Sequence, residues 1–479
     1  MRRKSEIWQM IRRRRSMKKH LHGHHIRIVE SPTKVLKEPR AFKRHRLIHF
    51  KDDIFPIGRG NKRLQILRSN LMPRNLKYVL NDSMSPFYYE EIEKYHCPKD
   101  GIVEIPKNFS IIENPNKSFN VLRIMLSAIF IQGIREVSLN YKSCEHVDLT
   151  TQVLLDSLIL DYTDFSKRYS KVRRLHKINF CETLKGINIE NEKVRKMLFS
   201  VGTPKVLNIS SVQYEDVTPY YLCRHDALKD NKKQSEQKDL DTTDLVDYVI
   251  NCLAKVNQQL NQKKIEALCT VIGEALINAE EHSSLKYRYS IGYFQDELVE
   301  GKHTGIFRLV IMNFGKTIYE KFKDDNCPNP DIVGKMMTLS KKYTERRLFM
   351  PRFTEESLWT LYALQQGVSS TSPRISKRGN GFINFIESFF MLKGSSSVDD
   401  VSRTTITSGN TRVIFDGHYK IAEIKTEKKE TFKTMTFNKS GLIEDAPDNN
   451  FVYHDTNYFP GTIISAKIML NEDDVTYIK

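Results

Sequence analysis

One segment of the chain carries side chains whose types and spacing could do acid–base and cation-binding chemistry. Residues 263–283 are expected to form a helix, and they include EALINAEEH at 274–282. Glu274, Asn278 and His282 are four residues apart, so they share one face of that helix, with Glu281 beside them. A carboxylate that can accept a proton thus stands one turn before an amide oxygen that can ligate a hard cation. An ordinary solvated face is the alternative, and spacing alone favours it.

The same helix has a second, apolar side. Leu268, Ile272, Ala275 and Ala279 recur at helical intervals and predict a stripe that packs against other elements. A preceding helix is expected over 246–260, where apolar residues also recur at helical spacing. The chemistry-bearing face is therefore held by a helix that belongs to a packed domain.

The part of the chain upstream reads as a mixed α/β unit from about 70 to 224. Its pattern predicts a strand at 101–110, a helix at 119–134, a strand at 136–141 and a helix from 147 to 158. Residues 224–243 are almost wholly polar and without sustained periodicity. We therefore expect a domain boundary there, with a linker over 225–242.

The pattern ExxxNAxxH resembles the N box of the GHKL superfamily, the ATP-binding fold shared by histidine kinases, gyrase, MutL proteins, the heat-shock chaperone and anti-sigma-factor kinases. The resemblance implies that Glu274 is the base that orients the attacking water or hydroxyl. It implies that the side-chain oxygen of Asn278 holds Mg²⁺ against the phosphates of ATP. His282, on the same face, is expected among the nucleotide-binding residues.

The segment FRLVIMNFGKTI at 307–318 resembles the first glycine box of this family, in which a strand ends in DxGxG. Asn313 stands where the family has an adenine-binding Asp, Gly315 is retained, and Thr317 replaces the second Gly. Asn313 could accept a hydrogen bond from the adenine amino group through its carbonyl. Without the negative charge, adenine affinity is expected to fall by about 1 kcal/mol.

Two further segments resemble the remaining boxes. KRGNGF at 377–382 is similar to the second glycine box, with Gly379 and Gly381 at the start of a helix, where backbone N–H groups favour phosphate. FPGT at 459–462 resembles the closing box, which implies that Thr462 lies near the adenine pocket.

Some assignments within this region stay open. Thr411, in SGNT, competes with Thr462 for the adenine position. Lys377 or Arg378 could reach phosphates from the end of a lid over 319–376, or be solvated charges, which we favour slightly. Residues 417–455 are expected to be an insertion.

A weaker resemblance covers the segment EVSLNYKSCEHVDLTTQVLLDSL at 136–158, which is similar to the STAS fold of anti-sigma-factor antagonists. Asp148, Leu149, Thr150 and Thr151 fall where that family has an Asp-Ser-Ser-Gly helix start with a phosphorylated hydroxyl. Thr150 is thus a candidate phosphoacceptor, although helix capping is the better explanation for both threonines.

The basic charge of the chain is concentrated in a tail. Of a formal net charge of +18 over 479 residues, residues 1–50 contribute +13, with RRRR at 12–15. Such a tail could contact nucleic acid or another anionic surface, and a solvated tail without a dedicated partner is equally compatible. The His cluster at 20–25 lacks Cys or carboxylate ligands at metal spacing, so a physiological metal site there is not expected.

The remaining composition narrows the class of protein. No apolar run reaches the roughly 18 residues that a membrane span requires, and 121–134 is interrupted by Arg123 and Gln132. Seven scattered cysteines without a CxxC pair indicate a reducing compartment. We therefore expect a cytoplasmic protein without a secretory signal.

Together these patterns predict an α+β protein: a basic tail (1–50), a STAS-like α/β domain (70–224) and a GHKL, or Bergerat-type, α/β sandwich (243–472). The expected function is ATP- and Mg²⁺-dependent phosphoryl transfer to water or to a protein Ser/Thr, with lid closure coupled to a protein partner. The alternative is a non-catalytic, nucleotide-gated module that binds nucleic acid through residues 1–50 in a salt-sensitive manner. The sequence leaves a homodimer open.

Overall fold

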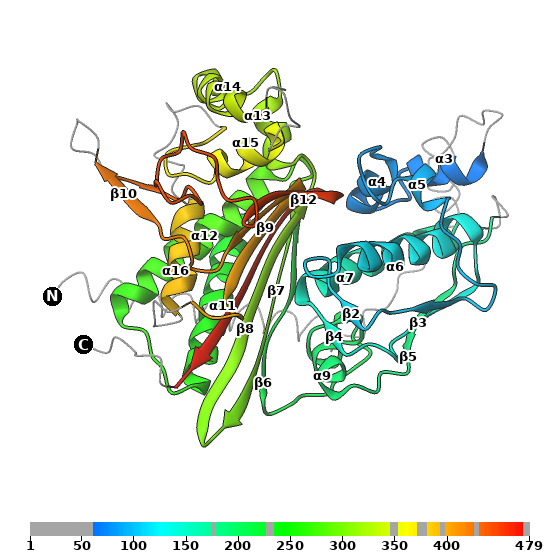
Figure 1. Cartoon of the computed structure of the whole chain (residues 1–479). Helices are drawn as coiled ribbons and strands as arrows, with labels where there is room; N and C mark the ends of the chain where they lie inside the picture. Colours follow the sequence, from blue (N-terminus) through cyan, green and yellow to red (C-terminus); the bar gives the residue numbers. More distant parts are fainter. Residues whose placement is uncertain are drawn as a thin grey trace.

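The computed structural model describes residues 61–173, 178–226, 234–344, 353–370, 381–392, 398–425 and 431–472. It contains parallel and antiparallel sheets together with many helices, which confirms the α+β class (Figure 1). In these residues no helix is long and apolar enough to cross a membrane. The expected basic tail at 1–50 lies outside the described residues.

The largest element is a five-stranded antiparallel sheet in the order β6-β7-β8-β12-β9. Its strands are β6 (Val217–Asp226), β7 (Tyr287–Val299), β8 (Lys302–Phe314), β9 (Arg403–Phe415) and β12 (Val452–Asn471). The longest strand, β12, lies between β8 and β9 and brings the last described residues to the centre of the sheet. Strands far apart in the sequence therefore meet in one layer.

Both faces of this sheet are covered, and β8 shows how the sequence achieves this. Because successive side chains of a strand point to opposite faces, Leu309 and Ile311 belong to one apolar core, and Val310 and Met312 to another. The first face packs against α11 (Gln234–Lys255), α12 (Gln262–His282) and α16 (Gly381–Leu392). The second face packs against α4 (Arg74–Asn81) and α7 (Leu149–Ser170) on the other side of the sheet (Figure 1).

The N-terminal unit contains parallel strands and several helices. Its three-stranded sheet has the order β1-β3-β5, formed by β1 (Ile102–Glu104), β3 (Glu136–Asn140) and β5 (Thr183–Ile187). A second parallel pair joins β2 (Asn108–Phe109) to β4 (His146–Val147). The other helices of this unit are α3 (Lys62–Arg68), α5 (Tyr89–Ile92), α6 (Pro115–Ser127), η1 (Ala128–Gln132), α9 (Glu192–Ser200) and α10 (Thr203–Val206).

Two expected elements of this unit differ in detail. The strand predicted at 101–110 is split into β1 and β2, with Pro106, which has no N–H for a sheet ladder, between them. The helix predicted at 119–134 is α6 followed by one π-helical turn, η1, which ends at Gly133 in the left-handed conformation. The local patterns thus predicted the types of these elements correctly. The interruption of the strand and the end of the helix depend on single residues.

The expected linker at 225–242 is wrong over most of its length. Residues up to Asp226 belong to β6, the edge strand of the large sheet, and α11 begins at Gln234; residues 227–233 lie outside the described part. Within this helix Asp241 is buried and accepts hydrogen bonds from Gln237 and Arg288, so a polar residue of the expected linker packs against the sheet. The unit built around the large sheet therefore begins at Val217, not at residue 243.

The candidate phosphoacceptor Thr150 is not accessible in this arrangement. Its side chain is 1% exposed and its hydroxyl donates to Ser465 Oγ of β12 at 3.0 Å. Thr151 is also buried, and its hydroxyl accepts from the backbone N–H of Ile111 at 2.7 Å. Neither threonine is the N-cap of α7, which is Asp148. Both side chains join α7 to its surroundings.

The region expected to form a lid is largely helical where it is described. It contains α13 (Ile318–Lys323), α14 (Pro330–Thr344) and α15 (Glu355–Ala363), which lie at one end of the large sheet (Figure 1). These helices have their own apolar core around the fully buried Trp359. The segment expected as an insertion connects β9 to β12 and includes the antiparallel pair β10 (Ala422–Lys425) and β11 (Thr431–Thr434).

Candidate functional site

The helix α12, which carries the ExxxNAxxH pattern, is fixed at both ends. At its start Asn261 is the N-cap, and its side chain accepts a hydrogen bond from the N–H of Lys264 at 3.0 Å. Near its end Glu280 is buried, with Oε2 2.8 Å from Nδ1 of His225 and 3.6 Å from Nε of Arg288. The carboxylate of Glu280 therefore anchors the end of α12 to strands β6 and β7.

Arg288 of β7 is the centre of this buried charge cluster. Its side chain is 0% exposed and pairs through Nη2 with Asp241 of α11 as well as through Nε with Glu280. Although burial opposes its charge, the nearby carboxylate of Asp241 holds the pKa of Arg288 above its ordinary value. One arginine thus joins α11 and α12 to the sheet.

Sequence reasoning overlooked Glu280 as a functional position, although a signal was present. Glu280 follows the buried Leu276 by about one helical turn, so it borders the packing side of α12. An acidic residue on a packing face must find a buried partner, since an isolated buried charge is costly. The partner, Arg288, could not be identified from spacing.

Glu274 and Asn278 lie side by side on another face of α12, and both are half-buried. In the described part of the chain neither the carboxylate of Glu274 nor the side-chain amide of Asn278 has a hydrogen-bond or ion-pair partner. Burial alone raises the pKa of Glu274 above its ordinary value. The two groups are thus free to act on something else, and the carboxylate is a stronger base than an exposed one.

The surrounding helices show in which direction these groups lie. Lys264 and Ala267, near the start of α12, line a small cavity with Ser388 and Leu392, near the end of α16. Since the start of α12 thus lies beside the end of α16 and the two helices pack together, they run antiparallel. Helical periodicity places Glu274 and Asn278 on the same side of α12 as Ala267, two to three turns further on. They therefore lie toward the start of α16 at Gly381.

Asn313 is used by the protein itself, contrary to the expectation that its carbonyl would receive adenine. Its side chain is 3% exposed; Nδ2 donates to the carbonyl of Ala279, and Oδ1 accepts from the N–H of Thr462 at 3.1 Å. The amide thus links the last turn of α12 to β12. Its bonding pattern requires one donor and one acceptor, which is why an Asn suits this position.

Gly315 allows a close approach between backbone segments. It has φ of +125°, and a Cβ there would lie 2.8 Å from the backbone nitrogen of Ser284. Ser284 directly follows Ser283, the C-cap residue of α12, so Gly315 lies against the end of that helix. Thr317, which replaces the second Gly of the family pattern, forms a capping box with Glu320 at the start of α13.

Thr462 and Thr411, the two residues expected to compete for a place beside adenine, have different surroundings. Thr462 is half-buried, is paired with Asn313 in the β8–β12 register, and has its hydroxyl 3.0 Å from Ser408 Oγ. Thr411 is fully buried, with its hydroxyl directed at Ser357 of α15. Only Thr462 stands next to the strand end that carries Asn313.

Several predicted site residues cannot be placed. Gly379, Lys377 and Arg378 lie outside the described residues, and the side chain of His282 is not described. Gly381 is the first residue of α16. Among the described residues, Asn313, Gly315 and Thr462 meet at the end of α12, and Glu274 and Asn278 lie earlier on the same helix.

Replacing Asn313 by Asp, the residue of the family pattern, is expected to destabilise the protein. A carboxylate can still accept from Thr462 but cannot donate to the carbonyl of Ala279, so a buried acceptor loses its partner at a cost of about 1–3 kcal/mol. Repulsion between the new carboxylate and the carbonyl of Ala279 favours the protonated acid in the folded state, so the pKa of this acid rises on folding. The loss of folding free energy therefore grows as pH increases. Urea unfolding at pH 5 and pH 8 measures this difference.

The exposed Asn208 provides the matched control for this substitution. Asn208→Asp should leave the unfolding midpoint nearly unchanged at both pH values. Equal stability of Asn313→Asp and the wild type at pH 8 would show that the bond to Ala279 contributes nothing.

Comparison of the chain with models of protein families, with curated protein sequences and with solved structures found no match.

Proposed function

We propose that the protein binds ATP with Mg²⁺ and transfers its terminal phosphoryl group, as proteins of the GHKL type do. The observation that carries this proposal is the pair Glu274 and Asn278, a half-buried carboxylate and an amide on adjacent turns of α12 that have no partner among the described residues. Three α-helices on one face of an antiparallel sheet, with helices at its end where a lid is expected, support it further. The STAS-like assignment of the N-terminal unit likewise remains a proposal.

The proposed roles follow from the chemistry of each side chain. Glu274, with its raised pKa, accepts the proton of the attacking hydroxyl and orients it. Asn278 offers a neutral oxygen to the magnesium ion, which when bound offsets the negative charge of the phosphates. The start of α16 lies in the direction of both side chains, and its backbone N–H groups favour phosphate.

The positions around Asn313 organise this site. Asn313 and Gly315 hold the last turn of α12 against the ends of β8 and β12, so that Asn278 keeps a fixed place. The half-buried Thr462 is the residue we assign to the adenine side of the nucleotide. The acceptor of the phosphoryl group is water or a hydroxyl of a protein partner.

A second candidate function is a nucleotide-gated interaction module without turnover. It is favoured by the two hydrogen bonds of the Asn313 side chain, one to the carbonyl of Ala279 and one from the N–H of Thr462. Because both polar groups of this side chain are bonded within the protein, they are not free to bind adenine. The basic residues 1–50 would contact the partner, for which nucleic acid is the first choice. Calorimetric titration with ATP, a non-hydrolysable analogue and GTP, with and without Mg²⁺, combined with a phosphate-release assay, separates the two functions.

Asn278→Ala is expected to weaken binding of ATP in the presence of Mg²⁺ by about tenfold, because one oxygen ligand of the cation is lost. Binding of ATP in EDTA should change by less than a factor of about three. Gln262→Ala, at an exposed position of the same helix, is the control. An Asn278→Ala variant with unchanged Mg²⁺ dependence would remove Asn278 from the metal site.

A further inference from the structure

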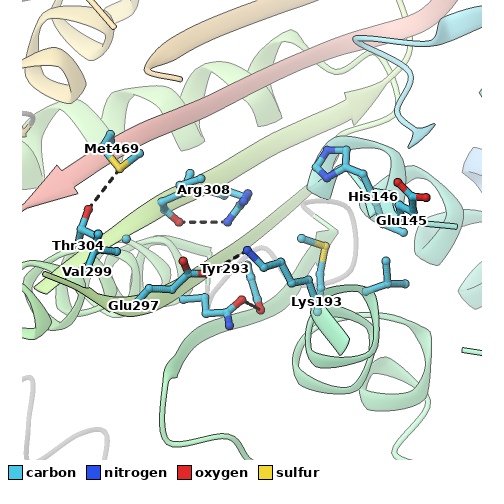
Figure 2. A pocket seen from close by; sticks show the side chains of 15 residues that line it. Glu145, His146, Lys193, Tyr293, Glu297, Val299, Thr304, Arg308 and Met469 are labelled. Atoms are coloured by element: carbon cyan, nitrogen blue, oxygen red, sulfur yellow. Dashed lines mark hydrogen bonds and ion pairs between the residues drawn. The ribbon is translucent and has the colours of Figure 1, made fainter. Parts of the chain in front are cut away.

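A second site lies on the opposite side of the large sheet from α12. An open cavity of about 270 Å³ is lined by β7, β8 and β12 of the sheet and by β4 and α9 of the N-terminal unit (Figure 2). Much of its wall is apolar and is formed by Val147, Val194, Met197, Val299, Ile306 and Met469. Its size is close to the lower end of the range found for small-molecule sites, about 300–1,000 Å³.

The charged groups around the cavity are paired, with one exception. Lys193 and Glu297 form an ion pair at 3.2 Å, and Glu145 pairs with Lys107 at 3.1 Å. Arg308 projects from β8 beside the cavity, and it makes no ion pair within the described part of the chain (Figure 2). Its Nη1 donates to the carbonyl of Ile306 at 3.2 Å, which leaves other guanidinium donors to be satisfied.

Burial opposes the charge of Arg308, and the ring of Tyr293 and the nearby carboxylates of Asp148 and Glu297 offset this effect only in part. The guanidinium lies over the ring of Tyr293, 5.7 Å from its centroid, and burial lowers the pKa of Arg308 below its ordinary value. A smaller cavity shares Arg308 and His146 and is also lined by Lys467 and Asp148. Lys467 adds positive charge there, while the carboxylate of Asp148 forms no ion pair with Arg308 but still favours its charged form.

We propose that this cavity binds a small organic carboxylate whose anionic end pairs with Arg308. A guanidinium presents parallel N–H donors that match the two oxygens of a carboxylate. The apolar body of the ligand lies against Val194, Met197 and Met469. A monoanion fits better than a dianionic phosphate, because Lys193, the other cationic side chain that lines the cavity, is already paired with Glu297.

The ligand would contact both parts of the protein at once. Met197 and Val194 come from α9 of the N-terminal unit, whereas Arg308 and Met469 come from the sheet. An occupant therefore increases the contact between the two parts and raises the thermal midpoint by mass action. The site is independent of the proposed nucleotide site, since Arg308 and Leu309 point to opposite faces of β8.

The test uses hexanoate as the probe, with hexanol and inorganic phosphate for comparison, in calorimetric titrations of the full chain. Hexanoate should bind with one-to-one stoichiometry and more tightly than either comparison compound. Arg308→Gln should weaken hexanoate binding by about tenfold or more and leave the weak binding of hexanol unchanged. Arg135→Gln, at a position whose side chain is 85% exposed, is the matched control and should bind as the wild type does.

A second variant guards against a folding defect in Arg308→Gln. Val299 lines the cavity but is 50% exposed, so Val299→Trp is expected to fold and to narrow the cavity while leaving Arg308 in place. This variant should also lose hexanoate binding by about tenfold or more. Undetectable hexanoate binding to the wild type, equal affinity in either variant, or tighter binding of phosphate than of hexanoate would each overturn the proposal.

Discussion

Glu274→Gln is expected to lower Mg²⁺-dependent ATP turnover by about 10²–10⁴-fold, the contribution typical of a general base. Glutamine keeps the size of the side chain and can still orient a hydroxyl, but it cannot accept the proton. Because no residue in the described part of the chain pairs with Glu274, the substitution breaks no structural contact there. Nucleotide affinity, measured by calorimetry, should therefore change by less than a factor of about three.

The pH dependence of turnover tests the role of Glu274 as general base independently. Burial raises the pKa of Glu274, so the deprotonated, active form is populated only above that raised value. The rate should rise with pH through an apparent pKa higher than that of an ordinary glutamate, and this step should be missing in the residual activity of Glu274→Gln. A steady-state assay between pH 4 and pH 9, within the stable range of the protein, measures it.

Glu266→Gln is the matched control, since Glu266 lies on the same helix and is exposed. Its turnover and pH profile should equal those of the wild type. A Glu274→Gln variant with unchanged turnover would place the base elsewhere. A wild-type protein that binds ATP without consuming it would favour the non-catalytic module.

Arg288→Met is expected to cost about 3–5 kcal/mol of folding free energy, the typical result of removing one partner from a buried ion pair. The substitution leaves the buried carboxylates of Asp241 and Glu280 without their shared cation. The loss should be smaller at pH 5 than at pH 8, because protonation of the carboxylates removes their uncompensated charge. Urea unfolding at the two pH values measures both effects.

The control and the double variant identify the cause of this loss. Arg195→Met replaces an exposed arginine and should change the unfolding free energy by less than about 0.5 kcal/mol. Adding Asp241→Asn to Arg288→Met should recover part of the stability, since it removes one of the two carboxylates. An additive double variant would show that the two side chains do not interact.

The same cluster links stability to the candidate site. Glu280 follows Asn278 by two residues, and its contacts with His225 and Arg288 fix the end of α12. A variant without Arg288 should therefore also lose Mg²⁺-dependent nucleotide binding before it unfolds. The position of Glu274 and Asn278 is thus expected to depend on Arg288, which lies outside the proposed nucleotide site.

The sequence by itself determined the elements and the candidate chemistry. Periodicity predicted the helices that became α11 and α12 and the strands that became β8 and β12, because spacing of apolar residues is a local property; α11 ends at Lys255, before the predicted residue 260. It also placed Glu274 and Asn278 on one helical face. The α+β class followed from the same local patterns.

Only the tertiary structure decided which polar residues are free and which are used internally. Asn313, Thr150 and Asp241 look like site, phosphorylation and linker residues in the sequence, yet each is buried with partners that lie from 34 to 315 residues away. The cavity beside Arg308, which has no ion pair within the described residues, could not be foreseen either. Such pairings depend on how distant strands and helices meet, and no local pattern encodes the distance between them.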